Sequence, residues 1–232
     1  MFSIVIPVYN ESENIENLFN EILISLKQYS EYEIIIIDDF SNDGTINKIK
    51  RLNKIKNIKL ICNDKNYGQS FSIHRGILES NYNTIVTIDG DGQNNPNDIP
   101  KLIERFNSDE NLLLLGGIRK KRKDNIVKII SSRLANLVRS RILDDDCKDT
   151  GCSLKIFEKN VFTEIPYFDG IHRFLPALFK GFGYKTQFVN VDHRKRKYGY
   201  SKYGTINRLY KGIIDIYKVK KIIKNKNIWI LF

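Results

Sequence analysis

The stretch TIVTIDGDGQNNPNDI, residues Thr84 to Ile99, begins as an apolar run and then places Asp89 and Asp91 on either side of Gly90. The apolar run is typical of a buried strand, and Pro96 favours the start of a helix. Successive strand residues normally point to opposite faces, but glycine lets the backbone turn so that both carboxylates can approach one centre. The stretch therefore predicts a strand, a turn and a helix, with two acidic groups at the strand end.

The same alternation of strand and helix runs through the first half of the chain. Apolar strands are predicted over residues 2–9, 33–39, 58–63 and 111–118, with segments of helical spacing between most of them. Continuous Ile, Val and Leu strands separated by helices indicate a mainly parallel sheet with both faces covered. We therefore predict an α/β fold, with ligands bound beyond the carboxyl ends of the strands.

The second half of the chain has a looser pattern. Helices are predicted over residues 125–143 and 171–180, strands within 144–157 and over 185–191, and a long helix over 205–224. The sequence contains no internal repeat and no Pro/Ser-rich linker. We expect one domain over residues 1–203, followed by a basic C-terminal segment over 204–232 that contacts a membrane surface or the acceptor.

The excess positive charge is confined to the end of the chain. The net charge is +11, and residues 194–226 hold 12 Lys and Arg against one acid, Asp215. Such a segment indicates an anionic partner such as a membrane surface, a phosphate-bearing substrate or nucleic acid, although it can also be a solvated basic tail. The apolar residues predicted on one face of the last helix are Ile206, Leu209, Tyr210, Ile213, Ile214 and Tyr217. This pattern fits a membrane interface, and it fits equally a helix docked on the domain's own core.

The cysteines and the hydropathy restrict the compartment. Three cysteines, Cys62, Cys147 and Cys152, have no spacing typical of a disulfide framework or a zinc site, so we expect a reducing cytoplasm. No apolar stretch approaches the roughly 20 residues that span a bilayer. We therefore expect a cytoplasmic protein that is soluble or peripheral to a membrane.

The DGDGQ turn has the chemistry of a divalent cation site. Carboxylate oxygens of Asp89 and Asp91 suit Mg²⁺ or Mn²⁺, and Gln93 could add an amide oxygen. Because Mg²⁺ usually keeps waters and substrate phosphates as its other ligands, such a sparse set predicts a diphosphate ligand. The alternative is an Asp-Gly turn that only caps the helix starting near Pro96.

Eight motifs in this order and spacing resemble the family 2 glycosyltransferases of GT-A fold. Within that family the chain is most similar to the dolichyl-phosphate mannose synthase and undecaprenyl-phosphate sugar transferase group. The motifs are SIVIPVYNESENI, IIIIDDFSNDGT, NYGQSFSIHRGI, TIDGDGQNNP, GGIR, DTGCSLKIF, HRFLPAL and HRKRKYGYSKYG. The resemblance implies a Rossmann-like, mainly parallel sheet flanked by helices, and it covers nearly the whole chain.

The resemblance also implies roles for individual residues. Positions that match the nucleoside-binding pocket are Pro7, Tyr9, Asn10, Glu11, Asp38 and Asp39, with Asp89 beside the diphosphate. Those that match the metal site are Asp89, Asp91 and Gln93, and those that match the catalytic groups are Asp91, Arg119 and Arg133. Those that match the acceptor-binding groups are Arg133, Arg196, Ser201 and Lys202. Plainer roles remain open: Asp39 could shape a turn, Glu11 could cap the first helix, and Arg133 could be a solvated charge.

The implied reaction is an inverting transfer of a hexose, of mannose or glucose type, from a nucleotide-diphosphate sugar to a dolichyl or undecaprenyl phosphate. The enzyme would depend on Mg²⁺ or Mn²⁺ and lie at the inner face of the cytoplasmic membrane. A phosphate acceptor with a second pKa of about 6 arrives largely as a dianion and needs no general base. A saccharide hydroxyl would need one, for which Asp149 is the candidate, although we favour a supporting role for that residue.

Two alternatives stay open. The first is transfer to a saccharide hydroxyl in capsule or lipopolysaccharide assembly. The second is a basic nucleic-acid-binding protein, which is disfavoured because the positive charge is confined to the tail while the strand ends are acidic. His172 is expected to be structural, and Arg173 could reach a phosphate.

Overall fold

The computed structural model describes residues 1–52, 58–120, 136–196 and 205–226, with the backbone alone for residues 205–211. Seven strands form one sheet in the order β3-β2-β1-β4-β6-β5-β7. The strands are β1 (Phe2–Val8), β2 (Tyr32–Asp38), β3 (Ile58–Cys62), β4 (Thr84–Thr87), β5 (Leu112–Lys120), β6 (Lys155–Glu158) and β7 (Lys185–Asp192). Each strand expected from the sequence is present, with bounds that differ by one or a few residues.

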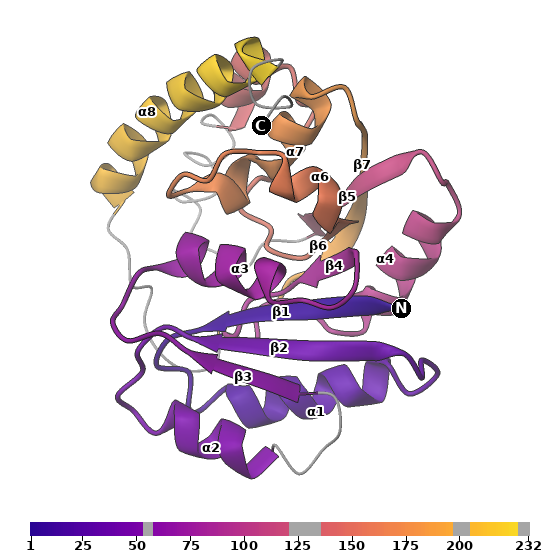
Figure 1. Ribbon diagram of the computed structural model, residues 1–232, viewed down its shortest axis with the longest axis vertical. Coiled ribbons are helices and arrows are strands. Elements are labelled where there is room, and N and C mark those ends of the chain that lie inside the picture. The colour runs from indigo at the N-terminus through magenta and orange to yellow at the C-terminus, as the bar shows by residue number, and fades with distance from the viewer. Residues whose placement is uncertain (53–57, 121–135, 197–204, 227–232) are drawn as a thin grey trace.

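Helices cover both faces of this sheet (Figure 1). They are α1 (Ile15–Ser25), α2 (Thr45–Leu52), α3 (Gln69–Leu78), α4 (Asp98–Asn107), α6 (Lys159–Thr163), α7 (Ile171–Gly181) and α8 (Thr205–Lys224). Residues 136–143 are also helical. One core lies between the sheet and α1, α2 and α4, and the other lies between the sheet and α3, α6, α7 and α8. The α/β prediction is therefore confirmed.

One strand runs against the others. β1 pairs in parallel with β2 and β4, and β2 pairs in parallel with β3. β6 lies between β4 and β5 and is antiparallel to both. Because β6 reverses direction against each neighbour, β4 and β5 point the same way. The carboxyl ends of β1, β2, β4 and β5 therefore share one edge of the sheet, as the sequence predicted.

The last helix, α8, has two apolar faces rather than the single face that we predicted. Val219 and Ile216 pack with α7 in the second core, together with Ile222 and Ile223. Ile213, Ile214 and Tyr217 are instead 63%, 40% and 73% exposed. The other three residues of the predicted face, Ile206, Leu209 and Tyr210, lie outside the described side chains. The helix is docked on the domain, and it still presents apolar groups to solvent.

Short helices α2 and α6 were not predicted, because each lies beside a strong turn or strand signal and buries few residues. Of the predicted helix over 125–143, only the last part falls within the described residues. Nowhere in the described ranges is there a helix with the length and apolar character that crossing a bilayer requires.

Candidate active site

The turn after β4 is shaped by two glycines. A side chain at Gly90 would come within 2.7 Å of Val8 Cγ1, so the turn can pack against the end of β1 only with glycine there. Gly92 has a φ of +71°, a conformation that glycine adopts without strain. The two glycines thus place Asp89 and Asp91 close together at the edge of the sheet.

Asp89 is held in an environment that opposes its charge. It keeps some contact with solvent, but the protein packed around it and the nearby charge of Asp91 raise its pKa to about 6. The positive charges of Lys155 and Arg119 act in the opposite direction on this pKa. Gln69, at the start of α3, donates a hydrogen bond to Asp89 Oδ1 at 2.7 Å. Two carboxylates in such proximity favour the binding of a cation.

Asp91 is contacted from the late basic loop. Arg196 Nη2 donates to Asp91 Oδ2 at 2.8 Å and lies 3.5 Å from Glu11 Oε1. The backbone N–H of Gln93 donates to Asp91 Oδ1 at 3.0 Å, and the Gln93 side chain donates to the carbonyl of Arg194 at 3.3 Å. Four of the predicted site residues, Glu11, Asp91, Gln93 and Arg196, are therefore brought together.

Arg119, at the end of β5, forms a bidentate ion pair with Asp149. Its Nε and Nη2 donate to the two carboxylate oxygens, each at 2.7 Å, and its backbone N–H donates to Oδ2 at 3.1 Å. A side chain at Gly151 would approach Arg119 Nη2 to 2.7 Å, so this glycine leaves room for the guanidinium. Asp149 supports Arg119, as we favoured from the sequence.

The adjacent acids at the end of β2 have different surroundings. Asp39 accepts hydrogen bonds from the backbone N–H groups of Tyr67 at 2.9 Å and Gly68 at 2.7 Å, so it shapes the loop before α3. Asp38 is fully buried, and its Oδ2 accepts from the N–H of Ser41 at 2.9 Å. Its Oδ1 has no hydrogen-bond partner among the described residues. A buried acceptor of this kind is available to a ligand donor.

The loop after β1 is tied to the loop after β2. The backbone N–H of Asn10 donates to Ser41 Oγ at 2.8 Å, and Asn10 Oδ1 accepts from the N–H of Asn42 at 2.9 Å. The backbone carbonyl of Glu11 accepts the N–H groups of Asn14 and Ile15, and its carboxylate accepts from the side chain of Asn14 at 2.7 Å, so Glu11 does not cap α1 with its side chain. The other predicted pocket residues, Pro7 and Tyr9, are half-buried at the end of the same strand.

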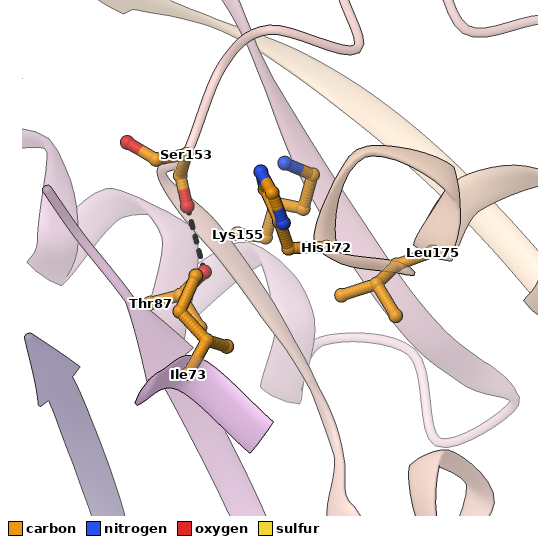
Figure 2. Close-up of a pocket in the computed structure, with 6 residues that line it drawn as sticks. All are labelled: Ile73, Thr87, Ser153, Lys155, His172 and Leu175. Carbon is orange, nitrogen blue, oxygen red and sulfur yellow. Dashed lines mark hydrogen bonds between the residues drawn. The ribbon is translucent and has the colours of Figure 1, made fainter. Parts of the chain in front are cut away.

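Buried Lys155 and the ring of His172 line a cavity of about 10 Å³ (Figure 2). It is lined by Ile73, Thr87, Ser153, Lys155, His172 and Leu175. This volume suits about one water molecule and is too small for a sugar. Lys155 donates to the carbonyl of Cys152, and His172 Nδ1 lies 2.7 Å from Ser70 Oγ. That His172 is structural stays a prediction, and the positive charge of Lys155 acts on the nearby Asp89.

Sequence reasoning missed Lys155 and Gln69. A lysine within the apolar segment SLKIF was the available signal for the first, and the polar residue that opens the NYGQSF helix was the signal for the second. Arg173 pairs with Asp215 at 2.7 Å rather than facing the strand ends. The predicted residues Arg133, Ser201 and Lys202 lie outside the described residues.

The acidic groups are few. Within the described ranges, no three His, Cys, Asp or Glu side chains form a group that could hold a metal ion. Asp89, Asp91 and Gln93 lie on the same turn, and their assignment to a metal site stays a prediction. A cation held there would need further oxygen ligands from water or substrate.

Comparison with known proteins identifies the family. The model of the family "Glycosyl transferase family 2" matches residues 3–165. The chain belongs to this family. This family 2 glycosyltransferase is 32% identical to the dodecaprenyl-phosphate galacturonate synthase of Rhizobium johnstonii, over 97% of this chain and 68% of that protein. It is 31% identical to the undecaprenyl-phosphate 4-deoxy-4-formamido-L-arabinose transferase of Proteus mirabilis, over 90% of this chain and 65% of that protein. The chain thus spans about two thirds of the length of these relatives.

Solved structures confirm that the family 2 chain has the GT-A fold. Mannosyl-3-phosphoglycerate synthase from Rubrobacter xylanophilus superposes with a TM-score of 0.72 at 12% identity, covering 98% of this chain and 75% of that one. Glucosyl-3-phosphoglycerate synthase from Mycobacterium tuberculosis, solved with Mn²⁺, uridine diphosphate and phosphoglyceric acid, gives 0.68 at 16% identity, covering 96% and 78%. At these identities the likeness concerns the fold.

Proposed function

We propose that this glycosyltransferase moves a sugar from a nucleotide-diphosphate donor to a polyprenyl phosphate, with inversion at the reacting carbon. The observation that carries the proposal is the Asp89 and Asp91 pair at the carboxyl edge of the sheet, faced by Arg119, Lys155 and Arg196. An acidic pair within a cationic surround suits a metal-bound diphosphate. The names of the relatives support a polyprenyl phosphate as the acceptor.

The acidic pair fits a divalent cation. Its oxygens are hard ligands, and the pKa of Asp89 is raised first by burial and then by the negative charge of Asp91, both of which a bound cation would offset. Asp89, Asp91 and the amide of Gln93 would hold Mg²⁺ or Mn²⁺. When bound, the ion would neutralise charge on the diphosphate. The neighbour solved with Mn²⁺ and uridine diphosphate is consistent with this assignment.

The cations of the chain would act on the leaving group. Negative charge grows on the diphosphate as its bond to the sugar breaks, and fixed positive groups stabilise that charge most in a site shielded from water. Arg119 is held in place for this task by both oxygens of Asp149. Buried Lys155 would add a second positive charge near Asp89, and Arg196 of the late basic loop would add a third near Asp91. Arg133 keeps its proposed role beside the two phosphates.

The acceptor is better assigned as a phosphate than as a sugar hydroxyl. A hydroxyl must lose a proton during attack, and Asp149 was the base that the sequence suggested for it. Both carboxylate oxygens of Asp149 accept hydrogen bonds from Arg119. A carboxylate engaged in this way is a poor general base for an acceptor hydroxyl. A phosphate dianion attacks without a base. Direct attack by the acceptor in a single displacement would invert the sugar carbon.

The donor is proposed to be a nucleotide sugar of hexose type. Asp38 Oδ1, buried at the end of β2, has no hydrogen-bond partner among the described residues, which supports our assignment of Asp38 to the nucleoside pocket together with Asn10 and Glu11 of the neighbouring loop. The two relatives are named for a galacturonate and for a substituted arabinose, which makes the sugar a property to be measured.

A membrane surface is the proposed setting. Ile213, Ile214 and Tyr217 are exposed on α8, and Lys218 and Lys221 on the same helix are exposed as well. The helix over 136–143 adds the exposed residues Leu137, Val138 and Ile142. Apolar groups flanked by lysines favour a peripheral position at an anionic leaflet, here the inner face of the cytoplasmic membrane. Residues 204–232 would form the segment that makes this contact.

The test is acceptor preference with a donor panel. The purified full chain would be incubated with Mn²⁺, a set of uridine and guanosine diphosphate sugars, and either undecaprenyl phosphate or a saccharide acceptor. We expect one donor to be transferred to the lipid phosphate, giving a product of inverted anomeric configuration by NMR. Transfer to a saccharide hydroxyl alone, with activity lost in Asp149→Asn, would overturn the proposal in favour of polysaccharide assembly.

A further inference from the structure

Arg196 occupies a position between two carboxylates that come from different loops. Its Nη2 is 2.8 Å from Asp91 Oδ2 and 3.5 Å from Glu11 Oε1. The side chains of Arg196, Asp91 and Glu11 are 21%, 14% and 8% exposed, so the three charges are largely withdrawn from water. An arginine held in this way acts as the counter-ion of Asp91 and Glu11.

The backbone that carries Arg196 is fastened to the same acidic turn. The N–H of Arg194 donates to the carbonyl of Gln93 at 2.8 Å, and His193 forms an antiparallel bridge with Asn94. The Arg194 guanidinium is anchored elsewhere, on Glu21 at 2.5 Å and on Asn95 at 2.6 Å. These contacts of residues 193 and 194 hold the backbone that carries Arg196 beside the acidic turn.

The position of Arg196 conflicts with that of a cation on Asp91. A guanidinium on Oδ2 occupies lone pairs that a metal ion would use, and its positive charge repels a second cation at short range. We propose that Arg196 is a charge placeholder: it neutralises Asp91, and a divalent cation bound by Asp89 and Asp91 has to displace it from Asp91. This inference rests on the proposed function, since it takes the pair to be the metal site.

The diphosphate of the donor changes the effect of Arg196 on metal binding from unfavourable to favourable. A bare divalent ion brings only positive charge and competes with Arg196 for Asp91. A nucleoside diphosphate brings negative charge to the same place, and a displaced guanidinium can then turn to its phosphate oxygens. Arg196 therefore opposes the metal alone and favours the metal with its nucleotide. In this way the arginine would make metal binding depend on the donor.

The experiment is a titration of Mn²⁺ followed by electron paramagnetic resonance, which detects the free ion. It uses the full chain with and without uridine or guanosine diphosphate. Arg196→Gln is expected to bind bare Mn²⁺ about tenfold more tightly than the wild type, because a positive charge within a few ångströms is removed. With the nucleotide present, the same variant is expected to bind Mn²⁺ more weakly than the wild type.

Two further variants control for charge and folding. Arg194→Gln removes the same charge from the same segment but not from Asp91, so it should leave the affinity for bare Mn²⁺ unchanged. Arg196→Lys keeps a cation and should stay close to the wild type. Thermal melting checks that each variant is folded.

The outcomes separate the inference from the proposed function. If the wild type binds Mn²⁺ with the nucleotide, but Arg196→Gln binds bare Mn²⁺ no more tightly than the wild type, the placeholder role is wrong and the metal site stands. An equal gain in affinity for Arg194→Gln would also overturn the placeholder role, because the effect would then come from net charge. If the wild type binds no Mn²⁺ even with the nucleotide, the metal site of the proposed function is lost and the inference with it.

Discussion

Residues 1–120 and residues 136–196 contribute opposite charges to the same edge of the sheet. The first region supplies Asp38, Asp89 and Asp91 from the ends of neighbouring strands, and the second supplies Lys155 and Arg196 from a strand and a loop. The acids are placed by the ends of the parallel strands and, for Asp89 and Asp91, by the two glycines of the turn after β4. The cations are placed only by the way in which the second region folds over the first.

In one ion pair between the two regions, the first region supplies the positive charge and the second supplies the negative charge. Arg119 belongs to the first region, and Asp149 to the second. Ion pairs of both orientations therefore join the two regions at this edge, and Arg119, Lys155 and Arg196 each have a protein hydrogen-bond partner. Under our proposal a bound cation displaces one of these pairs, that of Arg196 with Asp91.

The largest expected effect comes from breaking the acidic side. Asp91→Asn removes a charge that would hold both the cation and Arg196, so turnover should fall by about 100-fold or more. The fold should persist, because Asn can still accept from the N–H of Gln93. Steady-state assays with a nucleotide sugar measure the change. Asp109→Asn is the control, since Asp109 pairs with Lys185 at the opposite edge of the sheet; equal activity in both variants would refute the acidic site.

The next effect tests how the second region holds the basic helix α8 that follows it. Asp215 on α8 is 1% exposed and pairs with Arg173 of α7 at 2.7 Å. Arg173→Gln leaves a buried carboxylate without this partner, so the free energy of unfolding should fall by roughly 2 to 4 kcal/mol in a urea titration.

A solvent-exposed pair provides the matched control. Lys180 pairs with Asp146, whose side chain is 77% exposed, so Lys180→Gln should cost less than about 1 kcal/mol. Equal losses in Arg173→Gln and Lys180→Gln would show that burial does not set the strength of these contacts.

A third effect concerns the free energy of keeping Asp89 ionised, buried and next to Asp91 in the first region. Because the pKa of Asp89 is raised to about 6, its ionised form is disfavoured in the folded protein. The cost is absent below the unfolded pKa near 4, grows as pH rises toward 6, and is fully present above that value. Asp89→Asn should therefore stabilise the metal-free protein by on the order of 2 kcal/mol at pH 7.5, with a gain that vanishes near pH 3.5.

Chemical denaturation in buffer containing a chelator, repeated across this pH range, measures the gain. Asn at this position can still accept from Gln69, so the hydrogen bond is kept. A destabilised variant at pH 7.5 would contradict the picture of a crowded acidic pair.

The smallest effect concerns the loop that follows β2. Phe40 has a φ of +69°, a conformation that side chains with a Cβ adopt at a cost, and its ring is 56% exposed. Phe40→Gly should raise the free energy of unfolding by roughly 0.5 to 1 kcal/mol, since relief of strain exceeds the added entropy of the unfolded chain. Phe40→Ala keeps the Cβ and should give no gain; a gain in both would assign the effect to the ring.

The difference between the two regions also explains what sequence reasoning could predict. Strand bounds and the acidic turn were predictable, because apolar runs and Asp-Gly turns are local signals. The insertion of β6 between β4 and β5 was not, because no local pattern specifies the order of strands in a sheet. For the same reason the partners of Lys155 and Arg196, and the match of Arg119 with Asp149, became known only from the fold.

The last helix shows a second limit. Its apolar residues recur often enough to define two faces, and the spacing gave no means of choosing the one that docks. Val219 is buried against α7 while Tyr217 is 73% exposed, so the docked face was set by the shape of its neighbour. Tertiary packing decides such cases.

Anomalous diffraction at the manganese edge would test the central claim most directly, using crystals grown with Mn²⁺ and uridine or guanosine diphosphate. The account predicts a single manganese peak between Asp89 and Asp91, bridged to the diphosphate, with the Arg196 guanidinium moved from Asp91 to the phosphate oxygens. A manganese ion and nucleotide bound away from this edge, with Arg196 still paired to Asp91, would contradict it.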